Sequence, residues 1–431
     1  MKRVLVFPAG SEIGLEINRA LRYAKNIELF GLTSKDDHSR CVYKNLISNS
    51  PYYYQSNFIM FLNNIIRIHN IDYIFPANDD VQLFLSINAL SINAKLVSSD
   101  TNTVKICRSK KLTYNHFKGY DFVPDFFDVF PINNLEDLPF PLFIKPNIGQ
   151  GSKGVKLISS YQDILPYLQN SEDFVLSEYL PGEEYTIDCF NDINGNLRYI
   201  VMRNRIRISN GISVNSKILK LDDEVQRIAN SIINKIKLVG AWFFQLKKDK
   251  NGKLKLLEIA PRVSGTMGLS RMKGINFPLL SCYNLSGIET RLIFNEYELE
   301  VDRALQSIYL TDLRYKSVYI DFDDTIVIND EINTNAMRFL YQCVNKGIEL
   351  ILVTRHKYDI YNSLDKYKIS KNLFTRIEQI DDGRKKSEII KNLDSIFIDD
   401  SFNERLDVYE NFKIPVFDLS EIEMLIDWRT Y

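Results

Sequence analysis

Apolar and polar positions along the first hundred residues predict alternating strands and helices. Residues 3–8 form a short apolar strand, and after Gly14 the apolar positions follow a helical period. Further strands are expected over Ile27–Leu32 and Tyr73–Pro76, and Asn78-Asp79-Asp80 follows the second of these. This order of strand, glycine turn, helix and strand is typical of a Rossmann-like unit, with the polar triplet in a loop at the carboxyl edge of its sheet.

The pattern changes from about residue 106. Apolar and polar positions now alternate as in antiparallel strands over three segments, 141–158, 174–190 and 197–208. A helical period returns over 222–236, and a further hairpin is expected over 241–259.

From Ser317 onward, short and fully apolar strands alternate with helices. These strands are expected at 317–321, 348–353 and 395–398. Near-continuous apolar strands suit a parallel sheet that is buried on both faces. We therefore expect a multidomain α/β and α+β chain, with a Rossmann-like subdomain over 1–105, a mixed domain over 106–300 and a parallel α/β domain over 315–431.

Composition narrows the classes of function. The 431 residues carry a formal net charge of −1, which argues against a bulk electrostatic grip on nucleic acid or anionic lipid. The five cysteines are scattered without metal-binding spacing, as in the reduced thiols of a cytoplasmic protein. The apolar run at residues 3–8 is too short for a signal peptide or a membrane span. We expect a cytoplasmic protein with neither nucleic acid nor membrane as its partner.

The segment Asp321-Phe322-Asp323-Asp324-Thr325 ends the first apolar strand of the C-terminal part. It places the carboxylates of Asp321 and Asp323 at the tip of a parallel strand, where α/β proteins bind ligands. One carboxylate would attack phosphorus and form an aspartyl-phosphate, while the other would protonate the leaving oxygen and later activate water. Mg²⁺ would neutralise the crowded negative charges.

Further polar residues follow at strand tips or at the start of a helix. Thr354 ends a strand and is expected to hydrogen-bond a phosphoryl oxygen, and Lys386 opens a helix and would neutralise phosphate. Asp399 and Asp400 end another strand and would hold Mg²⁺. These four motifs resemble the haloacid dehalogenase (HAD) superfamily over about residues 316–431. The resemblance implies a magnesium-dependent phosphatase whose metal site draws on Asp321, Asp323, Asp399 and Asp400.

The spacing of these motifs leaves no room for a cap domain. Residues 326–353, 28 in number, separate Thr325 from Thr354, and residues 355–385, 31 in number, separate Thr354 from Lys386. Neither gap holds a cap of the size that family members use. We expect an open site, which receives a large substrate or is covered by another part of the chain.

Residues 141–156 combine a strand lysine, Lys145, with a loop that contains Gly151 and Ser152 between two other glycines. Glycines let backbone N–H groups approach phosphate oxygens, and the lysine adds positive charge for α- and β-phosphates. The following strand–turn–strand segment, 176–186, can offer backbone groups to an adenine and a carboxylate to ribose hydroxyls. The residues concerned are Glu178, Tyr179, Leu180 and, for ribose, Glu184.

The hairpin over 241–259 predicts a pair of facing oxygen ligands. Asn251-Gly252 is a strong two-residue turn signal, and a turn there places Gln245 directly opposite Glu258 on the same face. Two oxygen ligands that meet across a hairpin suit Mg²⁺ bound to ATP. Side chains alternate between faces along a strand, so three arginines of the expected strand 199–208 share one face: Arg203, Arg205 and Arg207. These arginines are either solvated or bind a triphosphate or an acyl-phosphate.

Together these features resemble the ATP-grasp superfamily over about residues 1–300, specifically its carboxylate–amine ligases and carbamoyl-phosphate-synthetase-like members. The resemblance implies that Lys110 and Lys145 contact the nucleotide, that Gln245 and Glu258 hold metal, and that Arg262 lies near the γ-phosphate. One position departs from the family pattern. Ala260 stands where many members have asparagine, so one of the usual two Mg²⁺ ions is expected to be weaker or held differently.

The combined interpretation is a bifunctional enzyme. Its first part would use ATP and Mg²⁺ to join a small-molecule carboxylate to an amine through an acyl-phosphate, and its second part would remove phosphate from a related substrate or product. The alternatives are a phosphatase regulated by a non-catalytic nucleotide-sensing module and a carbamoyl-phosphate-synthetase-like enzyme. A homodimer is compatible with the resemblance, because relatives of the ligase part are often dimers.

Overall fold

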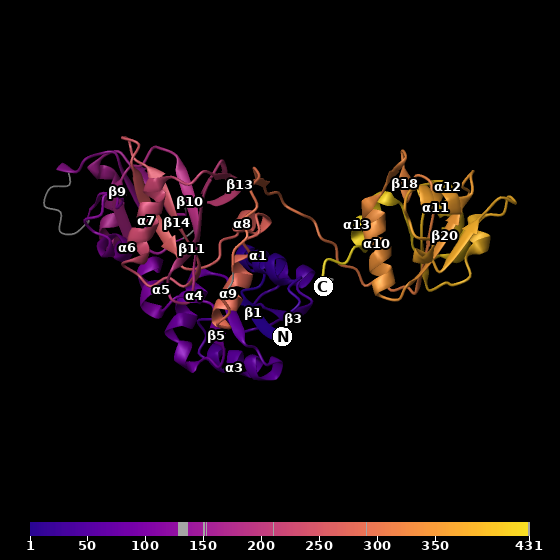
Figure 1. Ribbon diagram of the computed structural model, residues 1–431, viewed down its shortest axis with the longest axis horizontal. Coiled ribbons are helices and arrows are strands. Elements are labelled where there is room, and N and C mark those ends of the chain that lie inside the picture. Colours follow the sequence, from indigo (N-terminus) through magenta and orange to yellow (C-terminus); the bar gives the residue numbers. More distant parts are fainter. Residues whose placement is uncertain (128–136, 150, 152, 210, 290, 430–431) are drawn as a thin grey trace. The chain divides into compact units, whose positions relative to one another are not determined.

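The computed structural model describes residues 1–127, 137–149, 151, 153–209, 211–289 and 291–429. The chain forms two compact units, Met1–Leu305 and Gln306–Thr430 (Figure 1). Within the described residues, no helix has the length and apolar character needed to cross a membrane.

Unit 1 opens with a parallel sheet in the strand order β3-β2-β1-β4-β5. Its strands are β1 (Lys2–Phe7), β2 (Ile27–Leu32), β3 (Asn45–Ile47), β4 (Tyr73–Pro76) and β5 (Lys95–Leu96). The helices of this part are α1 (Glu12–Leu21), α2 (Ser39–Val42), α3 (Phe58–His69), α4 (Asp79–Ile87), α5 (Thr101–Arg108) and α6 (Lys110–His116).

Local residues explain the two turns that lead from this sheet into helices. Ser11 caps α1 by accepting a hydrogen bond from the backbone N–H of Gly14, and a Cβ at Gly14 would lie 2.4 Å from the carbonyl oxygen of Ala9. Asn78 caps α4 in the same way, accepting from the backbone N–H groups of Asp80 and Val81. The polar triplet that was predicted as a loop is therefore a helix cap with the first turn of its helix.

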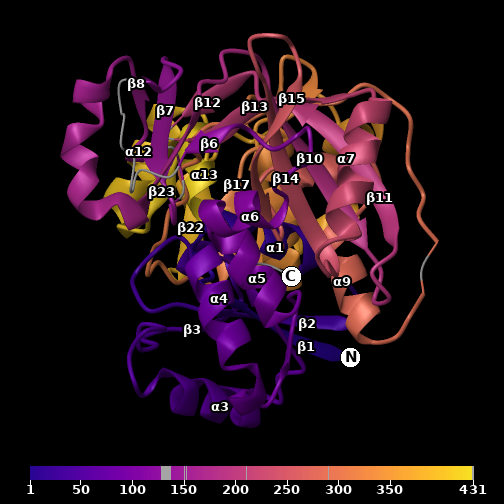
Figure 2. The same cartoon turned by 90° about the vertical axis from the view of Figure 1, so that its left-hand side faces the viewer.

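Two further sheets complete unit 1, side by side in Figures 1 and 2. The smaller has the order β6-β9-β7-β8 and comprises β6 (Phe126–Phe127), β7 (Leu142–Pro146), β8 (Lys156–Ile158) and β9 (Phe174–Glu178). The larger is antiparallel, in the order β12-β13-β11-β10-β14-β15 with β16 paired to β13. It comprises β10 (Glu184–Asn191), β11 (Leu197–Asn204), β12 (Arg207–Ser209), β13 (Ile212–Leu219), β14 (Gly240–Lys248), β15 (Leu254–Ala260) and β16 (Glu300–Asp302).

Alternate residues of β14 enter two different cores. Trp242 and Phe244 are fully buried in a cluster with residues of α7 (Asp223–Ile233), whereas Phe243 lies in a cluster with residues of β1 and of α9 (Phe277–Leu285). The short helix α8 (Gly268–Met272) precedes α9. Because side chains alternate between faces along a strand, β14 joins the antiparallel sheet to helices on both sides.

The hairpin β14–β15 differs from the expected one at its tip. Asp249 accepts hydrogen bonds from the backbone N–H groups of Asn251 and Lys253, and Gly252 lies at φ +81°. The loop therefore contains three residues, 250–252, rather than two. A register shift between Gln245 and Leu246 then restores the predicted pairing, so that Gln245 lies opposite Glu258.

The predicted arginine face is wrong. The backbone leaves the ladder after Asn204, and β12 begins at Arg207, so the three arginines do not share one strand. Arg203 is buried, whereas Arg207 is exposed and pairs with Asp302 of β16. Periodicity alone did not reveal this break, because the residues on both sides remain compatible with a strand.

Unit 2 is built on a parallel sheet in the order β21-β20-β17-β22-β23, as the apolar runs predict. Its strands are β17 (Ser317–Ile320), β20 (Glu349–Thr354), β21 (Arg376–Gln379), β22 (Ser395–Ile398) and β23 (Val416–Phe417). The helices are α10 (Thr334–Asn345), α11 (Ile360–Lys366), α12 (Phe402–Phe412) and α13 (Ile422–Leu425). A small hairpin, β18 (Val327–Ile328) with β19 (Glu331–Ile332), follows the tip of β17.

Candidate functional site

Four polar residues form one row across the antiparallel sheet of unit 1. Arg203 on β11 pairs with Thr186 on β10, Thr186 pairs with Gln245 on β14, and Gln245 pairs with Glu258 on β15. Residues that are register partners on adjacent strands lie on the same face of a sheet. The row therefore presents a guanidinium, a hydroxyl, an amide and a carboxylate side by side, and all four residues line one cavity.

Two adjoining cavities lie against this row. The smaller, about 230 Å³, is bounded by both the small sheet and the antiparallel sheet, and the larger is about 500 Å³. Ten predicted nucleotide or metal residues line the smaller cavity: Lys110, Lys145, Gly151, Glu178, Tyr179, Leu180, Glu184, Arg205, Gln245 and Glu258. Arg262 lines the larger cavity, and Ser152 lies outside the described residues.

Lys145 is the most deeply buried cation of the smaller cavity. Its side chain comes from β7, its Nζ donates to the hydroxyl of Tyr114 at 2.5 Å, and the residue is 7% exposed. Burial, with the nearby positive charge of Lys110, lowers the pKa of Lys145 to about 7. Burial also lowers the pKa of Lys110. A bound anion would favour the charged form of both lysines.

We expect the affinity for MgADP to depend on pH through Lys145. Phosphate oxygens favour the charged lysine, so binding raises its pKa above about 7 and takes up a proton above pH 7. The dissociation constant should therefore rise with pH above 7, by at most ~10-fold per pH unit, and level off below pH 7. Calorimetry in buffers of different ionisation enthalpy measures the proton uptake. The variant Lys145→Met should lose this proton uptake. The control variant Lys156→Met, which replaces an exposed lysine of β8, should retain it. Proton uptake that persists in Lys145→Met would show that another group takes up the proton.

The arginines near the row are each held by a carboxylate. Arg262 donates to Asp79 through two hydrogen bonds of 2.6 and 2.7 Å, and Arg203 donates to the buried Asp188 and to Ser264. Bidentate pairing fixes the plane of a guanidinium as well as its position. Burial alone would raise the pKa of the Asp79 carboxyl, yet the Arg262 charge holds that pKa below its ordinary value.

Arg205 and Glu184, which were predicted to contact phosphate and ribose respectively, form an ion pair with each other. Arg205 also donates to the carbonyl oxygen of Gly211 at 2.8 Å. The charges of Arg205 and Glu184 are therefore partly neutralised by each other when no ligand is bound.

Sequence reasoning missed several of these residues. Asp79 was noted only as part of a polar triplet, and Tyr114, Thr186 and Asp188 were not considered. The strand alternation of β10 places Thr186 and Asp188 on one face and was the available signal.

The row fits one cation better than a larger metal cluster. Glu258 is its only carboxylate, Gln245 adds an amide oxygen, and the buried hydroxyl of Thr186 has no hydrogen-bond partner in the described part of the chain. Ala260, two residues beyond Glu258, offers no ligand atom. Oxygen donors of this kind suit a hard divalent ion such as Mg²⁺.

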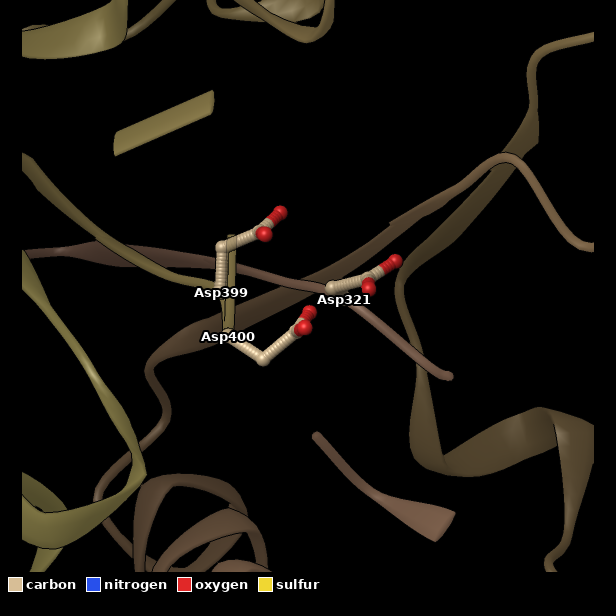
Figure 3. Close-up of side chains that lie close together, drawn as sticks. All are labelled: Asp321, Asp399 and Asp400. Carbon is tan, nitrogen blue, oxygen red and sulfur yellow. The ribbon is translucent and has the colours of Figure 1, made fainter. Parts of the chain in front are cut away.

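Unit 2 brings three carboxylates together at the tips of adjacent strands. Asp321 follows β17, and Asp399 and Asp400 follow β22 (Figure 3). Their ligand oxygens lie within 4.8 Å of one another, and the described residues contain no second such group of histidine, cysteine or carboxylate ligands. Lys386 contacts Asp321 at 2.9 Å and Asp399 at 2.7 Å and is itself buried.

Burial and the charge of Asp399, opposed by Lys386, raise the pKa of Asp321 to about 7. Burial likewise raises the pKa of Asp399. Carboxylates this close are costly when all are ionised, and a divalent cation would offset that cost. The residues present therefore fit the Mg²⁺ that the motifs imply.

The remaining predicted residues of unit 2 lie around this group. The hydroxyl of Thr354, fully buried, accepts from the backbone N–H of His356 at 3.1 Å. The side chain of Asp323 lies outside the group of Asp321, Asp399 and Asp400 and contacts the ring of His356 instead. Including Asp323 among the side-chain metal ligands is thus not supported by the geometry, and His356 was missed because a single histidine after a strand carries no motif.

Comparison with known proteins gives matches for unit 1. Residues 170–303 match the family model described as "ATP-grasp in the biosynthetic pathway with Ter operon". A D-alanine–D-alanine ligase of Thermotoga sp. is 24% identical over 144 residues, which are 31% of this chain and 47% of the relative. The chain thus spans about half the length of the curated relatives it matches.

Solved structures share the fold at low identity. The biotin carboxylase domain of a 2-oxoglutarate carboxylase from Hydrogenobacter thermophilus has a TM-score of 0.57 and 13% identity, covering 68% of this chain and 72% of that chain. N5-carboxyaminoimidazole synthetase from Staphylococcus aureus has a TM-score of 0.53 and 16% identity, covering 68% and 79%.

Proposed function

We propose, from the premise that unit 1 belongs to the ATP-grasp superfamily, that the chain is an ATP-dependent ligase joining a small-molecule carboxylate to an amine. The γ-phosphoryl group of ATP passes to a carboxylate oxygen, giving an acyl-phosphate and ADP. The amine nitrogen then attacks the acyl carbon, the bond from that carbon to the phosphate oxygen breaks, and the products are an amide and phosphate. A proton leaves the nitrogen in this step.

The observation that carries this proposal is the meeting of Lys110, Lys145, Gln245 and Glu258 at one cavity. Phosphoryl transfer depends mainly on positioning and on neutralisation of charge. The lysines supply positive charge for the phosphates, and Arg262, held by Asp79, faces the adjoining larger cavity, which we assign to the acid and the amine. Mg²⁺, held by Gln245 and Glu258, would neutralise the phosphate oxygens.

We propose a second activity for unit 2, the hydrolysis of a phosphomonoester. The carboxylate of Asp321 attacks phosphorus, the bond to the leaving oxygen breaks, and Asp323 donates the proton that this oxygen needs. Water then hydrolyses the aspartyl-phosphate. Lys386 neutralises Asp321 and the phosphate, and Asp399 and Asp400 would share Mg²⁺ with Asp321. The open site predicted from the sequence suits a phosphorylated acid, amine or amide handled by unit 1.

Two observations favour alternatives for unit 1. The row holds a single carboxylate, and Ala260 stands where many members of the superfamily have an asparagine that binds metal. A site with fewer metal ligands favours a nucleotide sensor that regulates unit 2. The solved structures of similar fold include a carboxylase complexed with bicarbonate, which favours bicarbonate as the acid.

A substrate screen tests the ligase and separates it from both alternatives. Wild-type protein with MgATP is expected to release ADP only when a carboxylate and an amine are both present, and mass spectrometry should detect their condensation product, one water lighter than the pair. ADP release with bicarbonate alone supports the bicarbonate alternative. Nucleotide binding without turnover across the screen supports the sensor.

A further inference from the structure

The side chain of Asp323 is held by a histidine that no motif predicted. Nδ1 of His356 lies 2.8 Å from one carboxylate oxygen of Asp323 and 3.0 Å from the other. The Asp323 side chain is 49% exposed, so solvent alone would leave it free to rotate. Two contacts to one ring nitrogen fix the plane of the carboxylate.

The histidine is itself held on its other side. Nε2 of His356 lies 2.6 Å from the hydroxyl of Ser363 on α11, and its ring packs edge-on against Phe322 with centroids 5.1 Å apart. Because a carboxylate only accepts hydrogen bonds, Nδ1 donates to it, and Nε2 shares the second hydrogen bond with the serine hydroxyl. The three side chains form a chain in the order Ser363, His356, Asp323.

The backbone of the segment that carries the histidine is also fixed. The amide nitrogen of Gln379, on β21, donates to the carbonyl oxygens of His356 and Tyr358 at 2.9 and 2.7 Å. Its amide oxygen accepts from the backbone N–H of Ile360 at 3.2 Å. Three contacts from the neighbouring strand thus hold the turn between β20 and α11 in one conformation.

We infer that His356 is a positioning residue: its Nδ1–H holds one oxygen of Asp323, and the other oxygen, protonated in the form of the enzyme that reacts, gives its proton to the leaving oxygen in the proposed phosphatase reaction. This inference rests on that proposed function. Held against His356, Asp323 stays apart from Asp321, Asp399 and Lys386, so one carboxylate acts on phosphorus and the other on the leaving group. A recess of about 530 Å³, lined by both Asp323 and His356, gives the leaving group room.

The inference predicts an effect that depends on the leaving group. An alkyl phosphate, 2-aminoethyl phosphate, needs a proton on its leaving oxygen, whereas p-nitrophenyl phosphate needs it far less. His356→Ala should lower kcat for the alkyl ester by ~10²-fold or more and for the aryl ester by no more than about 5-fold. His356→Asn, whose amide can still donate, should recover much of the loss.

A double-mutant cycle separates positioning from a general disturbance of the fold. With Asp323→Asn already present, His356→Ala should cost nothing further with the alkyl ester. Ser363→Ala should show a smaller loss of the same selectivity, and Tyr361→Ala, at an exposed site on the same helix, should match wild type.

Equal losses with both esters, or no loss in His356→Ala, overturn the inference while leaving the phosphatase in place. Absence of Asp321-dependent hydrolysis of either ester in wild-type protein overturns the phosphatase proposal and this inference with it.

Discussion

Asp321→Asn is expected to lower hydrolysis of phosphomonoesters by ~10⁴-fold or more while leaving ATP-dependent ADP release unchanged. An amide cannot attack phosphorus as a carboxylate does. Lys386 would still neutralise the phosphate, and Asp399 and Asp400 would still hold Mg²⁺, but none of them replaces the nucleophile. The separate measurements are release of inorganic phosphate from p-nitrophenyl phosphate and formation of ADP with a carboxylate–amine pair.

The substitution should not unfold the protein. Burial and Asp399 raise the pKa of Asp321 to about 7, above its value in the unfolded chain, so the ionised carboxylate weakens the fold as pH rises through 7. A neutral amide of the same shape removes that cost, and the melting temperature at pH 8 should be equal or higher. Residual hydrolysis above about one hundredth of wild type would place the nucleophile elsewhere.

The variant Asp321→Asn also shows which of the two proposed reactions comes first. If ligation comes first, Asp321→Asn accumulates a phosphorylated amide that mass spectrometry detects. If dephosphorylation comes first, the phosphorylated substrate accumulates and no amide forms until dephosphorylated substrate is supplied. If every phosphorylated substrate and product is processed as in wild type, the two activities are not sequential.

Glu258→Gln is expected to lower ATP-dependent ligation by ~10²–10³-fold. Glu258 is the only carboxylate of the row on β11, β10, β14 and β15, so its loss leaves no anionic ligand for Mg²⁺ there. Glutamine keeps the size of the side chain and its place opposite Gln245, which preserves the register of the hairpin. Activity should respond to higher Mg²⁺ concentration in the variant more than in wild type.

Glu289→Gln is the matched control, because this carboxylate is exposed and pairs with Arg198 at the surface. Its ADP release should equal that of wild type, and phosphate release by unit 2 should be unchanged in both variants. Ligation by Glu258→Gln at more than a tenth of the wild-type rate would exclude Glu258 as the principal metal ligand.

The sequence predicted the position of a site residue correctly where that position follows from local geometry. Asp321 and Asp399 were predicted together because apolar strands of a parallel sheet end at one edge. Gln245 and Glu258 were predicted as partners by counting from a turn. Contacts made by the tertiary fold were not predictable in this way. His356 meets Asp323 across 33 positions, and Arg262 meets Asp79 across 183.

The errors have equally specific causes. Three arginines at period two predicted a common face, but the ladder breaks between β11 and β12, and no periodicity marks that break. The turn at Asn251-Gly252 was expected to contain two residues, and the side chain of Asp249 adds a third by binding the backbone N–H groups of Asn251 and Lys253. The bulge further along β15 cancels that difference, so the predicted pairing of Gln245 with Glu258 was right although its turn was wrong.

That bulge divides the hairpin into two parts that can change independently. The β14–β15 register changes between Gln245 and Leu246, so the pairs on the tip side of the bulge follow a different register from the pair of Gln245 with Glu258. We expect an extra residue at the tip to change the register on the tip side of the bulge and to leave the pair of Gln245 with Glu258 in place. The exposed turn at residues 250–252 therefore gives evolution, or an experimenter adding a reporter group, a place to alter the hairpin without moving the carboxylate on which catalysis by unit 1 would depend.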